Sequence, residues 1–205
     1  MGFGKTLGIG LALFIGLNFA WTIVLQLVVI GQLTVFGELT DIGTILTVFF
    51  GGITLSPFIW ILQLIMGPVL GMMISMMGGG EGGSFISLPE NFMMLMILGA
   101  LGFVIPSLIT VIVIGKTSEG KGKAIGAWSI VAGASTALLW VAHTYFSASI
   151  DLGILSYIGM VLDPFGMMGM TEGFASMTGL LILVGGIVNW GFWGTFAMLF
   201  SKSGF

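Results

Sequence analysis

The chain alternates between long apolar runs and shorter segments that collect its polar residues. A membrane-crossing helix needs about 20 mostly apolar residues. Four runs meet this length without containing Asp, Glu, Lys or Arg, and they cover residues 7–31, 92–115, 124–147 and 176–200. The pattern predicts an all-α integral membrane protein whose single domain, residues 1–205, contains four transmembrane helices.

The pattern is broken between residues 33 and 90, where glycine and proline interrupt the apolar stretches. Gly51-Gly52 interrupts the first stretch, and Gly67-Pro68 lies at the centre of the second. Proline inside a helix removes a backbone donor and clashes with the preceding turn. We therefore expect residues 42–77 to form a broken helical hairpin, either in the membrane interface or as a re-entrant segment that enters the membrane.

The lysines decide how the predicted spans are oriented. All of them flank a predicted span, at Lys5, Lys116, Lys121, Lys123 and Lys202. Because positive residues mark the cytoplasmic side, both termini and loop 116–123 are expected in the cytoplasm, with segments 33–90 and 148–175 outside. Seven of the eight acidic residues lie in those two outer segments, which contain no Lys or Arg. A complete extra span over 57–77 would move the loop outside, so we favour four spans.

Both outer segments contain a methionine-rich stretch that is broken by glycine. These stretches lie at residues 62–83 and 159–173. Methionine fills irregular gaps well, so we expect the short outer segment at about 150–173 to pack with the first stretch as a cap. The alternative is thioether ligation of a soft metal ion such as Cu(I), but the chain has no cysteine and a single histidine to complete such a site.

The two halves of the chain resemble each other at the ends of the spans. Residues 4–8 (GKTLG) lead into the first span and residues 122–126 (GKAIG) into the third, while 115–118 (GKTS) and 201–204 (SKSG) follow the second and fourth. One interpretation is a tandem duplication of a two-span unit, related by an axis along the membrane normal. The other is that any four-helix protein with basic ends shows such a likeness.

Small and polar residues recur at three- and four-residue spacing inside the spans. Lipid provides no hydrophobic drive for helices to associate, so close backbone approach and interhelical hydrogen bonds hold membrane helices together. We predict a bundle packed through Gly/Ser/Thr seams, and its candidate helix-packing residues are Asn18, Gly99, Gly102, Gly126, Ser129, Gly133, Thr136, Gly186 and Asn189. The amides of Asn18 and Asn189 lie near mid-membrane, where they either bond between helices or contact a substrate or ion.

The only histidine, His143, is a candidate functional polar site. It is predicted to lie in the last turn of the third span before the outer surface. One interpretation is an interfacial side chain bonded to a neighbour. The others are a pH sensor or a metal ligand shared with another chain.

Composition agrees with a chain surrounded mostly by lipid. It is 57% hydrophobic and 6% charged, against about 25% charged residues in soluble domains. We therefore place the protein in the cell membrane as a multi-pass protein. The few basic residues argue against nucleic acid as a partner. Without cysteine or a Ser/His/Asp arrangement, we predict no enzyme, no catalytic or metal site and no cofactor.

The predicted function follows from the absence of charged residues within the predicted spans and from their small-residue packing surfaces. Ion-driven transport usually needs an ionisable residue inside the membrane, and the predicted spans contain no acidic residue, lysine or arginine. We expect a structural or accessory subunit of a larger membrane complex, or a self-assembling membrane component. Its partners would be other membrane subunits or copies of itself, and its lysines would contact lipid headgroups. The alternative is a passive pore, formed by oligomerisation or by segment 42–77.

Overall fold

The architecture was obtained as a computed structural model, which describes residues 2–30, 39, 41–53, 92–146 and 170–202. Within these residues the chain forms helices and no strand. The predicted all-helical class is confirmed for this part of the chain.

Four long helices and one short helix make up the described structure. They are α1 (Phe3–Leu25) with the π-helical turn η1 (Gln26–Ile30), α3 (Ile42–Phe50) with the 3-10 turn η2 (Gly51–Ile53), α5 (Phe92–Thr117), α6 (Lys121–Phe146) and α8 (Met170–Leu199). Three apolar stretches are long enough to cross a membrane, at Phe3–Val28, Lys121–Phe146 and Thr178–Leu199. A shorter one, Val104–Thr117, lies within α5.

The four long helices follow the order of the predicted spans, with shifted ends, but only three of the described helices contain an apolar stretch long enough to cross a membrane. Helix α6 begins at Lys121 where the prediction began at 124, and α8 begins at Met170 where it began at 176. Helix α5 covers the predicted span 92–115 and continues through Pro106, but its crossing of a membrane stays a prediction. Most of both methionine-rich stretches lies in 54–91 and 147–169, outside the described residues.

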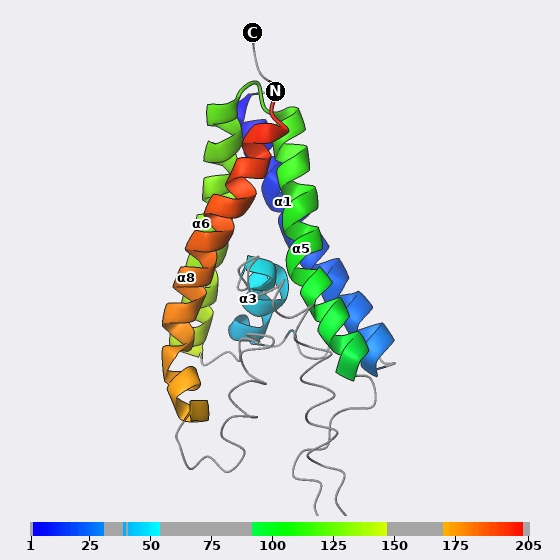
Figure 1. The fold of residues 1–205 in the computed structure, drawn as a ribbon, viewed down its shortest axis with the longest axis vertical. Coiled ribbons are helices and arrows are strands. Elements are labelled where there is room, and N and C mark those ends of the chain that lie inside the picture. Colours follow the sequence, from blue (N-terminus) through cyan, green and yellow to red (C-terminus); the bar gives the residue numbers. More distant parts are fainter. Residues whose placement is uncertain (1, 31–38, 40, 54–91, 147–169, 203–205) are drawn as a thin grey trace, which may run out of the picture.

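The long helices form two pairs, with α1 packed against α5 and α6 packed against α8. Figure 1 shows the pairs converging at the end that carries the start of α1, the end of α8 and the α5–α6 turn. Toward the other end the pairs diverge, and α3 lies between them. Each half of the chain supplies one pair, as a tandem duplication requires, although the duplication itself stays a prediction.

The apolar core lies where the two pairs converge. Phe14 of α1 and Trp128 of α6 are fully buried there, and their rings meet edge to face with centroids 6.2 Å apart. Val111 and Ile114 of α5 complete this contact region as members of the same buried cluster. Aromatic edge contacts of this kind add to the packing of the surrounding aliphatic side chains.

A tryptophan indole joins the two helices within each pair. In the first pair, Trp21 Nε1 donates to the carbonyl oxygen of Leu98 over 3.0 Å. In the second, Trp128 Nε1 donates to the carbonyl oxygen of Trp190 over 3.2 Å. A buried indole N–H needs an acceptor, so each bond satisfies a polar group and fixes the height of one helix against its partner.

Glycine permits the closest approach within the second pair. A Cβ atom built on Gly186 of α8 would lie 2.9 Å from the Cβ of Thr136 and would collide with the rest of that side chain. The Thr136 hydroxyl is held by a 2.8 Å hydrogen bond to the carbonyl oxygen of Ala132. Because Thr136 is branched and bonded in place, any side chain at position 186 must push the helices apart.

We predict that Gly186→Ala lowers the free energy of unfolding by about 1–3 kcal/mol, as expected for overpacking a well-packed contact. Gly191→Ala on the same helix is the matched control, because a Cβ there meets nothing within 4 Å. That control should be neutral or stabilising by up to about 1 kcal/mol, since alanine favours helix. Reversible unfolding in mixed micelles measures both, and equal effects of the two substitutions would refute the close contact.

Candidate functional site

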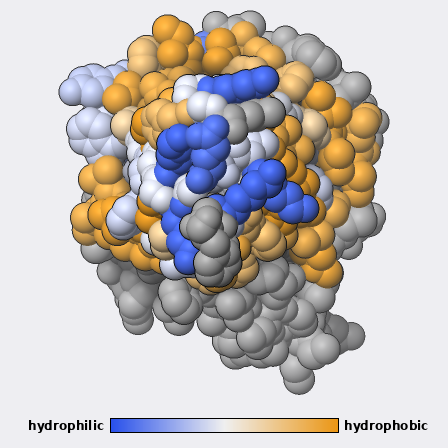
Figure 2. Space-filling view, turned by 90° about the horizontal axis from the view of Figure 1, so that it is seen from above, coloured by the Kyte–Doolittle hydropathy of each residue, from blue (hydrophilic) through white to orange (hydrophobic). Residues whose placement is uncertain are grey.

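The end where the helix pairs converge carries all of the positive side chains. Lys5, Lys116, Lys121, Lys123 and Lys202 are exposed there. Figure 2, which looks onto this end, shows hydrophilic side chains at its centre and hydrophobic ones around it. This basic end is the part of the described structure best suited to contact anionic headgroups, because lysine ammonium groups at the ends of apolar helices lie at headgroup level.

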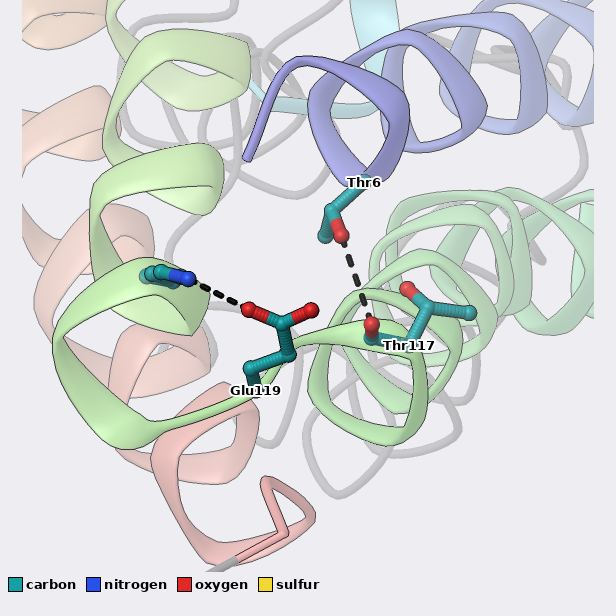
Figure 3. Close-up of polar contacts among 4 residues, drawn as sticks. Thr6, Thr117 and Glu119 are labelled. Carbon is teal, nitrogen blue, oxygen red and sulfur yellow. Dashed lines mark hydrogen bonds and ion pairs between the residues drawn. The ribbon is translucent and has the colours of Figure 1, made fainter. Parts of the chain in front are cut away.

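The turn between α5 and α6 contains one carboxylate among these lysines. Glu119 Oε2 lies 2.5 Å from Lys123 Nζ, and this hydrogen bond lowers the pKa of Glu119 to about 2. Figure 3 shows this contact beside the hydrogen bond from Thr6 Oγ1 to the carbonyl oxygen of Thr117, which is 3.4 Å long. Glu119 therefore stays ionised at neutral pH and offsets one of the five lysine charges, so the end remains positive.

An apolar groove of about 250 Å³ lies on the outer side of the α6–α8 pair. Its lining includes the exposed residues Gly133, Ala137, Ile187 and Trp190. Ile187 is 66% exposed, so the groove opens away from the core. The remaining lining residues are Ser129, Ala132, Thr136, Leu183 and Gly186.

The polar atoms of this groove are already hydrogen-bonded within the pair. Ser129 Oγ accepts from Trp190 Nε1 over 2.6 Å and donates to the carbonyl oxygen of Ile125 over 2.8 Å. The groove therefore presents small apolar groups to its surroundings. Such a surface suits a second helix, because small residues let helix backbones come close.

The predicted helix-packing residues are distributed over several contacts. Gly102 of α5 lies against the Trp21 ring of α1, and a Cβ on Gly126 of α6 would lie 3.3 Å from the Phe3 ring of α1. Thr136 and Gly186 meet between α6 and α8, whereas a Cβ on Gly133 meets nothing within 4 Å. Gly99 lies in α5.

The short helix α3 ends against the middle of α1. Its N-terminus is capped by Asp41, whose side chain accepts from the Thr44 backbone N–H over 2.8 Å and whose pKa is lowered by the Thr44 side-chain hydrogen bond. At the other end, the N–H of Gly52 in η2 donates to Asn18 Oδ1 over 2.9 Å. A Cβ on Gly52 would collide with the Asn18 amide, so this approach requires glycine.

Five buried polar side chains, at least one on each long helix and Asn18 among them, form a set that we call the polar layer. They are Asn18 of α1, Ser107 and Thr110 of α5, Ser135 of α6 and Asn189 of α8, and none is more than 5% exposed. Each of the four long helices therefore contributes to the layer. Other polar side chains are also buried in the bundle, among them Thr136 and, toward the basic end, Thr6 and Ser118. Buried polar groups cost free energy unless they are paired, so each of them needs a partner.

Close approaches between helices place these side chains at one depth. Gly10 of α1 lies beside Ile114 of α5 and Val131 of α6, while Gly186 lies beside Thr136. Counting residues from these contacts at about 1.5 Å each puts the five side chains within about 10 Å along the helix direction. The five side chains of the polar layer therefore lie at a similar depth along the bundle.

The two other polar candidates from the sequence face neighbouring side chains. Asn189 Oδ1 accepts from Trp193 Nε1 of its own helix over 3.1 Å. His143 is half-buried, and a Cβ on Gly179 of α8 would lie 3.8 Å from its ring carbon Cδ2. Among the described residues, no group of three His, Cys, Asp or Glu side chains gathers as metal ligands do.

Sequence reasoning did not select Ser107 or Ser135. A serine in a membrane helix commonly bonds to a carbonyl of its own helix, as Ser129 does, so its presence carries little signal. The signal that could have found the polar layer is its depth, because at least one polar residue recurs near the middle of each long helix.

No protein-family model, curated protein or solved structure matches this chain.

Proposed function

We propose that this protein is a structural or accessory membrane component that assembles side by side with other membrane helices. Its partners are copies of itself or other membrane subunits, together with the surrounding lipid. The proposal assigns it no catalytic role and no cofactor. Three long apolar helices support insertion into a membrane, and we place it in the cell membrane as a multi-pass protein.

The observation that carries the proposal is the apolar groove between α6 and α8. Gly133 lies on its open side, where a Cβ would meet no atom of the chain within 4 Å. Leu183, Ile187 and Trp190 surround the small residues with exposed apolar surface. Glycine at an outward-facing helix position lowers intrinsic helix stability, and a neighbouring helix that needs close approach would account for it.

We further propose four spans with the basic end in the cytoplasm. All five lysines lie at the end shared by the start of α1 and the end of α8, and positive residues favour the cytoplasmic side. In this orientation α5 crosses the membrane with its partner α1, and α3 enters from outside as a re-entrant segment. The contact between Gly52 and Asn18 supports the re-entrant placement, because Asn18 lies well inside α1.

We predict that a single cysteine at Gly120 reacts with a membrane-impermeant thiol reagent only from the cytoplasmic side. A single cysteine at Glu90 should react only from outside. The chain contains no native cysteine, so each variant reports one position. Labelling in intact cells and in inverted vesicles measures this, and reaction at position 120 in intact cells would disprove the orientation.

We predict that Gly133→Leu weakens self-assembly or complex formation about tenfold or more without lowering the stability of the fold. A Cβ at position 133 meets nothing within 4 Å, so a leucine can extend into the open groove without displacing the backbone. There it occupies the space that a neighbouring helix would need, and loss of close helix approach removes the packing that holds membrane helices together. Native mass measurement in detergent or photobleaching in liposomes gives the assembly state.

Gly16→Leu is the matched control for this change. Gly16 is exposed on α1, and a Cβ there also meets nothing within 4 Å, but it lies away from the groove. If wild type is monomeric with no co-purifying chain, or if the two variants behave alike, assembly through the groove is refuted.

A passive pore is the second candidate, favoured by the position of the α3 tip. The η2 turn contacts α5, α6 and α8, and it bonds to Asn18 of α1. A short segment that reaches all four long helices is suited to line a narrow path, where backbone carbonyls can replace the hydration of a permeating species.

If the pore candidate is right, purified protein in liposomes passes K⁺ or water, and Gly52→Val reduces this flux at least tenfold. Valine at position 52 collides with the Asn18 amide and displaces the α3 tip. Gly16→Val should leave the flux unchanged. Wild-type protein that passes neither K⁺ nor water would remove this candidate.

A further inference from the structure

We propose that the polar layer, together with the C-terminal end of α3, forms a binding site for a monovalent cation. The site rests on buried oxygen atoms of four helices and on the end of a helix dipole. It is independent of assembly through the outer groove. It also stands whether or not the protein forms a pore, since a bound cation can hold the helices together without passing through.

The five side chains belong to the faces that the helices turn toward one another. On α5, Ser107 and Thr110 share one face with Val111 and Ile114, and all four are fully buried. On α1, Asn18 continues the buried series of Thr6, Gly10 and Phe14, at four-residue spacing. Because three- and four-residue spacings keep side chains on one helix face, these oxygens are directed into the bundle.

Two of the hydroxyls have no hydrogen-bond partner in the part of the chain that the structure describes. Ser107 Oγ and Thr110 Oγ1 are buried and find no hydrogen-bond partner among the described residues. Serine and threonine in helices ordinarily bond to the carbonyl four residues earlier, and Ser135 does so with Val131 over 2.7 Å. A buried hydroxyl that makes neither a local nor a distant hydrogen bond within the described residues requires an explanation, and a bound ligand is one.

The end of α3 adds negative electrostatic potential at the same place. A helix carries a partial negative charge at its C-terminus, where the last carbonyl groups lack helical partners. Helix α3 has nine residues, and the turn that follows it reaches the polar layer through the bond between Gly52 N–H and Asn18 Oδ1. The η2 turn also contacts α5, so the negative end of α3 lies against the helix that carries the two unpaired hydroxyls.

These oxygens select the kind of ligand. Hydroxyl, amide and carbonyl oxygens are hard, neutral donors that suit Na⁺ and K⁺. Broken membrane helices bind such ions through their C-terminal ends. The layer contains no carboxylate, so it offers little to compensate the dehydration of a divalent ion. We expect monovalent cations to bind in the millimolar range, because no formal negative charge faces them.

The test compares thermal unfolding of the purified protein in detergent with Na⁺, K⁺ or N-methyl-D-glucamine at equal ionic strength. A cation that binds only the folded state raises the unfolding midpoint by about 3–5 °C at ten times its dissociation constant. Equilibrium binding of radioactive Na⁺ and Rb⁺ to the wild type, with Rb⁺ replacing K⁺, measures the site directly. No saturable binding and no cation-dependent shift would overturn the proposal.

The double variant Ser107→Ala/Thr110→Val identifies the site. It should lose the cation-dependent shift, while its midpoint in N-methyl-D-glucamine equals or exceeds that of wild type, because replacing unpaired hydroxyls by apolar groups removes a desolvation cost. Thr195→Val is the matched control, since Thr195 is exposed and bonds to the carbonyl of Phe192 on its own helix. It should keep the full shift.

Two further outcomes complete the test. If the double variant does not fold, the single variants Ser107→Ala and Thr110→Val replace it, and Thr110→Ser should retain the shift because it keeps the hydroxyl. A shift that persists unchanged in the variants would place the cation elsewhere and overturn the proposal. So would equal midpoints in Na⁺, K⁺ and N-methyl-D-glucamine, which would leave only a general effect of salt.

Discussion

An apolar surrounding leaves the polar groups of this chain with only one another as partners. Helices satisfy most backbone groups internally, so the remaining donors decide how the helices meet. Trp21 and Trp128 show the consequence, because each indole N–H reaches a backbone carbonyl of the helix paired with its own. These bonds help to align the two helices within each pair. Helix α3 lies between the two pairs, and the groove lies on the outer side of the α6–α8 pair.

Three contacts between segments share one design, in which a polar or aromatic side chain meets a glycine. Thr136 meets Gly186, Trp21 meets Gly102 and Asn18 meets Gly52. When two helix axes stay about 8–10 Å apart, a short polar side chain does not reach the backbone of the neighbouring helix. A glycine on that helix lets the two backbones come closer, so that the contact forms. The glycines of the sequence therefore have at least two roles. Some allow a close contact with a polar or aromatic side chain inside the fold, and others, such as Gly133, lie on the exposed outer surface of a helix.

Local features of the sequence were enough to predict the helices and the basic end, since apolar length and lysine position are local signals. Helix α6 began within three residues of its predicted start, at Lys121 against 124. The position of α3 could not be predicted, because it depends on Asn18 and Gly52, which are 34 residues apart in the chain. The polar layer was missed for the same reason, since serines on separate helices become a site only when packing brings them to one depth.

The unpaired hydroxyls are hard to explain as packing alone. A buried hydroxyl without a partner costs about 1–3 kcal/mol, and Ser107 and Thr110 both have this character. Alanine or valine would fill similar space without that cost, as Val111 and Ile114 do on the same face. Helix-to-helix bonding does not explain these hydroxyls either, because neither bonds to another of the described helices. The end of α3 contacts the helix that carries both hydroxyls. A ligand at this place would supply the missing interaction, and a cation is the ligand that the helix dipole favours.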